Sequence, residues 1–267
     1  MPDDMTLPGN LVPASPVSQP DQPAQARDAV TVVLLRDGAE GLEAFLLRRV
    51  KGMAFAGGMT VFPGGGVDQR DADTSVAWTG PPPQWWGEIF GVDAATARAF
   101  VCAAVREMFE ESGVLLAGPD ATSVVADTSA FTKARQQLVD REISLAQFLA
   151  AENLVLRADL LRPWANWVTP YEEPRRYDTR FFVAALPSGQ KADGETTEAS
   201  DAAWQTPAAA VEDAQEGRRM LMPPTWRTLD EVGALGSVEK VMAEERSVEK
   251  IIPKLIRDGD VIRVVFQ

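Results

Sequence analysis

The chain of 267 residues contains no histidine and a single cysteine, Cys102. A metal site in such a chain has to be built from oxygen ligands, which favours Mg²⁺, Mn²⁺ or Ca²⁺ over zinc. The lone cysteine excludes a disulfide within the chain, and this agrees with a cytoplasmic protein. A general base must be a carboxylate, or a metal-bound hydroxide whose proton a carboxylate accepts.

Long apolar runs and clustered positive charge are also missing. No stretch reaches the ~18–20 apolar residues of a transmembrane helix, and the first residues do not have the pattern of a signal peptide. The net charge is −13, from 39 acidic and 26 basic side chains without a dense basic block. We therefore expect no membrane partner and no long nucleic acid. A small anionic substrate remains compatible with this charge, because bound divalent cations reverse the local field. A homodimer is left open.

The composition suits one globular domain that follows a tail. Hydrophobic residues make up 45% of the chain, which is enough for a sizeable core. Residues 1–27 contain six prolines and little periodicity. We expect a flexible tail over 1–27 and a single domain over 28–267.

Three glutamates are predicted to share one helix face. Glu107, Glu110 and Glu111 are spaced i, i+3 and i+4 within a helix predicted over 93–112 and ended by Gly113. Like charges at these spacings destabilise a helix by roughly 0.2–0.5 kcal/mol per pair. Two neighbouring glutamates alone would indicate a solvated surface, but these three border the apolar stripe of the helix. The position favours a bound cation.

A glycine-rich segment lies upstream at 62–66, where Phe-Pro precedes Gly64, Gly65 and Gly66. Glycines let the backbone approach phosphates closely, although alone they would indicate an ordinary tight turn. Arg48 and Arg49, at the end of a predicted strand, either supply positive charge near this loop or are solvated strand ends.

Together the two segments resemble the Nudix box. The resemblance is carried by Pro63-Gly64-Gly65 and by Arg106-Glu107-x-x-Glu110-Glu111-x-Gly113. It implies a loop–helix–loop whose glutamates bind Mg²⁺ or Mn²⁺ for pyrophosphate cleavage. Glu110 and Glu111 would be the principal ligands, Glu107 a further ligand or helper, and Arg106 the structural arginine.

The box is interrupted after Asp71, the acid expected to pair with Arg106. The two lie 35 positions apart instead of close together, so we place an insertion at about 72–98. Asp68 and Asp73 are rivals for the pairing. The insertion holds three prolines at 81–83, and its Trp85 and Trp86 either pack back onto the core or form a lid at the site.

The split box is similar to the Nudix branch of peroxisomal coenzyme A diphosphatases. We expect a metal-dependent hydrolase of a pyrophosphate bond in a nucleoside diphosphate linked to another group, with coenzyme A or acyl-coenzyme A favoured. The arginine of the coenzyme A signature is replaced by Ala54. Dinucleotides or nucleotide sugars are the alternative substrates, and a non-catalytic ligand-binding module is the alternative class. The general base would be Glu107, Glu110 or Glu198, although Glu198 is more simply part of a solvated acidic loop.

Periodicity and turn residues predict an α/β fold, and the resemblance implies an α/β/α sandwich with a mixed sheet. Residues 154–161 are ambiguous between strand and loop. Strands are predicted at 29–36, 43–49, 59–62, 179–186, 202–205 and 261–266. Helices are predicted at 93–112, 129–140, 145–153, 207–217, 225–235 and 238–245.

Overall fold

The computed structural model describes residues 4–8, 22–50, 52, 56–196, 199–258 and 261–265. At its centre is an eight-stranded sheet, in which six strands follow the order β11-β3-β2-β10-β9-β12 while β4 pairs with β3 and β5 with β2. The β2/β10 and β9/β12 pairs are parallel and the others antiparallel, so the sheet is mixed. The strands are β2 (Ala26–Gly38), β3 (Gly41–Arg49), β4 (Thr60–Val61), β5 (Gly64–Gly66), β9 (Leu161–Val168), β10 (Arg176–Ala185), β11 (Ala199–Gln205) and β12 (Lys250–Ile251).

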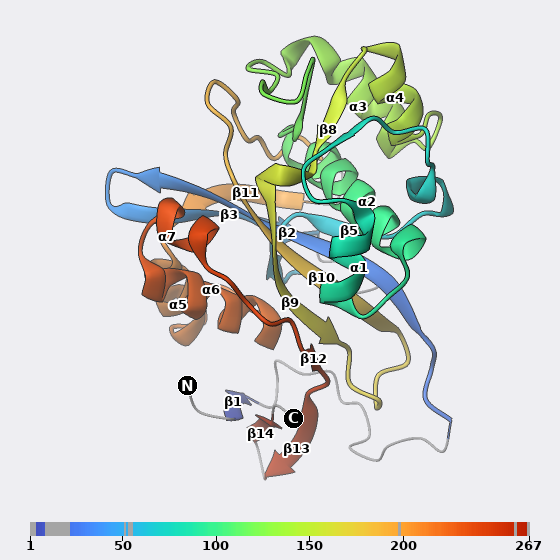
Figure 1. Cartoon of the computed structure of the whole chain (residues 1–267). Coiled ribbons are helices and arrows are strands. Elements are labelled where there is room, and N and C mark those ends of the chain that lie inside the picture. The colour runs from blue at the N-terminus through green and yellow to red at the C-terminus, as the bar shows by residue number, and fades with distance from the viewer. Residues whose placement is uncertain are drawn as a thin grey trace.

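Helices cover both faces of this sheet (Figure 1). Strand β2 is apolar along most of its length because successive side chains enter different cores. Val32 and Leu34 pack in the core that contains the long helix α2, and Val33 and Leu35 pack in the opposite core. The first core lies under α1 (Pro83–Phe90) and α2 (Ala94–Ser112), and the second under α5 (Pro207–Gln215), α6 (Pro223–Leu235) and α7 (Val238–Ala243).

Smaller elements extend the sandwich. The helices α3 (Thr132–Val139) and α4 (Leu145–Ala151) follow α2 in the chain. A three-stranded sheet has the order β6 (Trp78–Thr79), β8 (Val155–Arg157), β7 (Ala117–Gly118), and a second has the order β1 (Asp4–Pro8), β14 (Val261–Val265), β13 (Lys254–Asp258). None of the helices in the described part of the chain combines the length and apolarity that a bilayer-spanning segment needs.

Most predicted elements are present, and the insertion is the main exception. Consecutive prolines normally resist regular structure, but the segment that contains Pro83 and both tryptophans forms α1. Pro83 occupies the first helical turn, where a missing N–H costs nothing, and Gly91 ends the helix in the left-handed region. Trp86 is completely buried, whereas Trp85 is 37% exposed. The ambiguous segment at 154–161 divides into β8, a 3₁₀ turn and the start of β9.

The expected tail over 1–27 is described only in part. Asp4–Pro8 forms β1, which pairs with β14, and β2 begins at Ala26. Most of the remaining tail lies outside the described residues, so its flexibility stays a prediction.

Candidate active site

The glycine segment lies directly against β2. Gly64–Gly66 forms β5 and pairs with residues 29–31 of that strand. A Cβ at Gly64 would lie 2.3 Å from the Val30 carbonyl oxygen, so no other residue fits without moving the backbone. A Cβ at Gly65 would lie 2.5 Å from Oε2 of Glu107. The glycines therefore allow the loop to sit between β2 and the glutamate helix.

Arg106 joins three elements in the interior of the site. Its Nε and Nη2 donate to the two carboxylate oxygens of Asp71, both at 2.9 Å, and Nη2 also donates to the Gly66 carbonyl oxygen at 2.9 Å. Its Nη1 donates to Glu107 at 2.7 Å and to Glu110 at 3.3 Å. One guanidinium thus holds the segment before the insertion, the glycine strand and α2 together.

The rival acids have other partners. The Asp71 side chain, 2% exposed, also accepts the backbone N–H of Asp68 at 2.8 Å. Asp68 itself accepts from Nε and Nη2 of Arg70, and this hydrogen bonding lowers the pKa of its carboxyl. Asp73 accepts the backbone N–H of Ser75. Asp71 is therefore the carboxylate that pairs with Arg106, from a position 35 residues earlier in the sequence.

The three glutamates of α2 have different environments. Glu107 and Glu110 share a single nitrogen of Arg106, while buried Glu111 accepts the backbone N–H of Gly64 at 2.8 Å. Burial raises the pKa of the Glu107 carboxyl to about 7, an effect that Arg106 opposes and Glu110 reinforces. Burial also raises the pKa of Glu110. The site therefore contains more carboxylates than its arginine can balance.

The donor chemistry of these side chains fits a divalent cation. All of them offer hard oxygen ligands, as Mg²⁺ and Mn²⁺ require, and the excess of carboxylate over guanidinium favours added positive charge. Within the residues that the structure describes, however, no three Asp, Glu, Cys or His side chains gather into a preformed metal cluster. Arg106 and the Gly64 N–H hold these oxygens instead.

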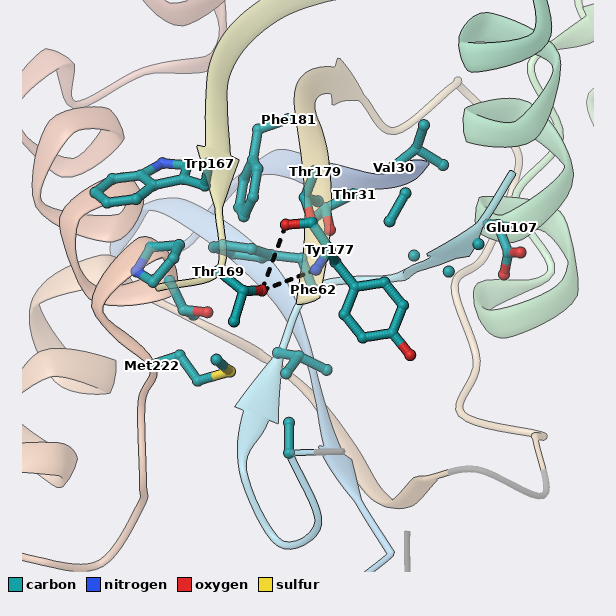
Figure 2. A pocket seen from close by; sticks show the side chains of 18 of the residues that line it. Val30, Thr31, Phe62, Glu107, Trp167, Thr169, Tyr177, Thr179, Phe181 and Met222 are labelled. Atoms are coloured by element: carbon teal, nitrogen blue, oxygen red, sulfur yellow. Dashed lines mark hydrogen bonds between the residues drawn. The ribbon is translucent and has the colours of Figure 1, made fainter. Parts of the chain in front are cut away.

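A cavity of about 740 Å³ opens from the glycine strand and the glutamate helix. Figure 2 shows Glu107 on one side of it and Trp167, Phe181 and Met222 on the other. Between these ends, the Thr169 hydroxyl accepts the Tyr177 N–H at 3.0 Å. One end of the cavity is acidic and lined by glycine, and the other is apolar. Further residues lining its walls are Thr31, Phe62, Arg141, Thr179 and Leu221.

The predicted site residues are not all at the cavity. Gly64, Gly65, Gly66, Arg49, Arg106, Glu107 and Glu110 line it. Asp71 and Glu111 lie behind this surface and hold Arg106 and the glycine strand. Glu198 and Ala54 lie outside the described residues.

Sequence reasoning missed the apolar end and Arg141. The segments around Trp167, Phe181 and Pro223 were given no role in the site. The structure brings these segments together from β9, β10 and the start of α6. No residue of the insertion at 72–98 lines the cavity, and Trp86 packs back onto the core, as the first of the two alternatives predicted.

The sequence matches the model of the NUDT19 Nudix domain over residues 87–232, more than half of the chain. The chain belongs to this Nudix hydrolase family. The match includes the whole carboxylate helix and reaches into α6, and with it the expected Nudix family and α/β fold are confirmed.

Individual relatives agree with this Nudix assignment. The chain is 31% identical over 188 residues to the putative nudix hydrolase 7 of Caenorhabditis elegans, covering 67% of this chain and 52% of the relative. It is 25% identical over 227 residues to the acyl-coenzyme A diphosphatase NUDT19 of Xenopus laevis, covering 70% and 58%. The human protein of that name is 26% identical over 264 residues, and the match covers 83% of this chain and 70% of the human protein. The chain thus spans little more than half the length of the first two relatives.

A solved structure shares the Nudix fold over most of the chain. The NUDIX hydrolase from Alicyclobacillus acidocaldarius superposes with a TM-score of 0.70 at 27% sequence identity. The match covers 84% of this chain and 98% of that one. The central sheet and its helical layers are therefore those of a Nudix hydrolase.

Proposed function

We propose that the protein hydrolyses the pyrophosphate bond of a nucleoside diphosphate linked to another group, with Mg²⁺ or Mn²⁺, and that coenzyme A or acyl-coenzyme A is the favoured substrate. The observation that carries this proposal is the cavity with two unlike ends. The acidic, glycine-lined end suits a pyrophosphate, while Trp167, Phe181 and Met222 offer an apolar surface to another part of the substrate.

Each side chain at the acidic end has a proposed role. Glu110, Glu111 and Glu107 would hold the cation, which when bound offsets the phosphate charge and activates water. The glycine strand admits the phosphates close to the backbone. Glu107 lies at the phosphate end of the cavity, where its carboxylate is a candidate proton acceptor. Glu110 and Glu198 are the other candidates for this role.

The apolar end supports acyl-coenzyme A over substrates that carry a polar nucleoside or sugar on the far side of the pyrophosphate. An acyl chain gains roughly 0.8 kcal/mol for each CH₂ that it buries, and a second nucleotide gains less from such a surface. The names of the NUDT19 relatives, which are 25–27% identical to this chain, point to the same substrate class.

The test is a substrate screen with Mn²⁺, in which products are identified by mass. Coenzyme A, acyl-coenzyme A, NADH, ADP-ribose and diadenosine polyphosphates are compared. We expect the highest kcat/KM for acyl-coenzyme A, with two products whose masses sum to substrate plus one water. Turnover of the dinucleotides alone would refute the coenzyme A assignment, and no turnover of any compound would refute hydrolysis.

A glutamate variant tests the proposed metal ligands in the same assay. We expect Glu111→Gln to lower kcat/KM by at least about 100-fold while the far-ultraviolet circular dichroism stays that of the parent. Glu88→Gln, at an exposed position on α1, is the matched control and should keep parental activity. Unchanged turnover in the Glu111 variant would refute its assignment as a ligand.

A further inference from the structure

Arg141 has a backbone conformation that residues other than glycine rarely adopt. It follows α3 with a φ of 59°, in the left-handed region. Its N–H donates to the Leu138 carbonyl at 2.9 Å, and the Glu142 N–H donates to the Gln137 carbonyl at 2.8 Å. These two bonds form the Schellman motif that closes a helix, in which Arg141 takes the place usually held by glycine.

The same chain uses other residues at comparable helix ends. Gly91, Gly113 and Gly236 have positive φ after α1, α2 and α6, and Asn153, a residue that tolerates this conformation, follows α4. Glycine or asparagine would therefore end α3 at a lower conformational cost than arginine. Helix termination does not account for the side chain at position 141.

The Arg141 side chain lines the acidic end of the cavity and is largely uncommitted. It is 77% exposed, and its nearest ion pair is a distant one, 3.9 Å from Asp68. Asp68 already accepts three hydrogen bonds from Arg70, at 2.9, 3.1 and 3.2 Å. In contrast, Arg106 donates to Asp71, Glu107, Glu110 and Gly66. Arg141 therefore has donors to offer a ligand, and Arg106 does not.

We propose that Arg141 binds phosphate oxygens of the pyrophosphate substrate at the acidic end of the cavity. A guanidinium presents paired N–H donors that match phosphate geometry, and its charge is permanent. The carboxylates of α2 would repel a phosphate, so a cation near them adds to binding. This inference rests on the proposed pyrophosphate substrate.

Two variants separate the charge of Arg141 from its backbone strain. Arg141→Gly removes both, and Arg141→Gln removes the charge alone. Binding of imidodiphosphate, a non-hydrolysable pyrophosphate analogue, is measured by calorimetry with Mg²⁺, and Tm is measured in parallel. We expect both variants to bind about 10- to 100-fold more weakly. The glycine variant should have an equal or higher Tm, because it relieves the left-handed strain.

Asn153→Gly is the matched control. It makes the same backbone change after α4, at an exposed position that does not line the cavity. We expect parental affinity in this variant, and an intermediate affinity in Arg141→Lys. Parental affinity in Arg141→Gln would overturn the inference.

Kinetics distinguish this inference from the proposed function. If the parent hydrolyses acyl-coenzyme A and Arg141→Gln has parental KM and kcat, the inference fails and the function stands. If no pyrophosphate compound is hydrolysed but imidodiphosphate binding depends on the charge at position 141, the function fails and the binding residue stands.

Discussion

At the scale of single residues, the site is dominated by the charge around Arg106. Three carboxylates, Asp71, Glu107 and Glu110, contact this one guanidinium. A carboxylate removed from water needs a positive partner or a proton. Glu107 shows the consequence, because burial raises its pKa to about 7 even though Arg106 contacts it. A bound cation would remove this conflict.

The raised pKa of Glu107 predicts how the stability of the cation-free protein depends on pH. The ordinary pKa of glutamate is about 4.5, so the folded protein binds more protons than the unfolded chain between about pH 4.5 and 7. Its unfolding free energy therefore falls as pH rises through that window. We expect Glu107→Gln to reduce this fall by about 2–3 kcal/mol, measured by urea unfolding in EDTA at about pH 5 and pH 8.

The control for this measurement is Glu88→Gln, which makes the same chemical change on the exposed surface of α1. It should keep the pH dependence of the parent. Parallel curves for the parent and the Glu107 variant would mean that this carboxylate has an ordinary pKa in the folded protein.

Individual side chains differ in how far they were predictable. The motif pointed to Asp71 as the partner of Arg106, despite two rival aspartates and the long interruption. Arg141 had no such motif, because its position depends on how α3 ends and on which loop then faces the cavity. A motif within one segment identifies the residues of that segment that act together. Which residues from other segments face the cavity depends on tertiary packing.

At the scale of elements, the residues at the helix ends determined which helices could be predicted from the sequence. The helix α2 was predicted to within one residue because both ends carry strong signals. The Asp93 carboxylate accepts the N–H groups of Ala95 and Thr96, and Gly113 ends the helix in the left-handed region. Helix α1 was not predicted because consecutive prolines disfavour a helix interior, although Pro83 at the first helical position favours a helix start.

Strand β9 was missed for a related reason. Pro163 lies in its interior, and proline is normally confined to strand edges and irregularities. The pairing of β9 with β10 shifts register between Phe181 and Phe182, next to Pro163. This irregularity accommodates the proline, but it is a property of two paired strands, so one segment alone could not indicate it.

The glycine strand provides a prediction at this scale. Gly64→Ala places a methyl group against the backbone of β2, where the Val30 oxygen would be 2.3 Å away. We expect a loss of about 1–3 kcal/mol in unfolding free energy, because the backbone must move. Gly66→Ala is the control in the same strand, since its added Cβ meets nothing within 4 Å. It should be neutral or stabilising by up to ~1 kcal/mol. Equal effects in chemical denaturation would contradict the close packing of β5 on β2.

At the scale of the whole molecule, the interruption in the Nudix box contributes to the core. Helix α1 packs against α2, and Trp86 contacts Phe90 and Phe182, the latter from the central strand β10. The insertion thus closes one face of the sheet instead of covering the cavity. Sequence alone left this open, because a tryptophan pair in a proline-rich segment suits either role.

The neighbouring tryptophans separate these roles experimentally. Trp86 is completely buried, so Trp86→Ala should lower the unfolding free energy by about 3–5 kcal/mol through lost contacts and a cavity. Trp85 is 37% exposed and its ring contacts Trp86 edge-on, so Trp85→Ala should cost only about 1–1.5 kcal/mol. Because neither side chain lines the cavity, the Trp85 variant should keep the kcat/KM of the parent. A variant at Trp85 that stays folded but loses activity would mean that the insertion reaches the substrate, and equal stability losses would mean that Trp86 is not the residue that anchors it.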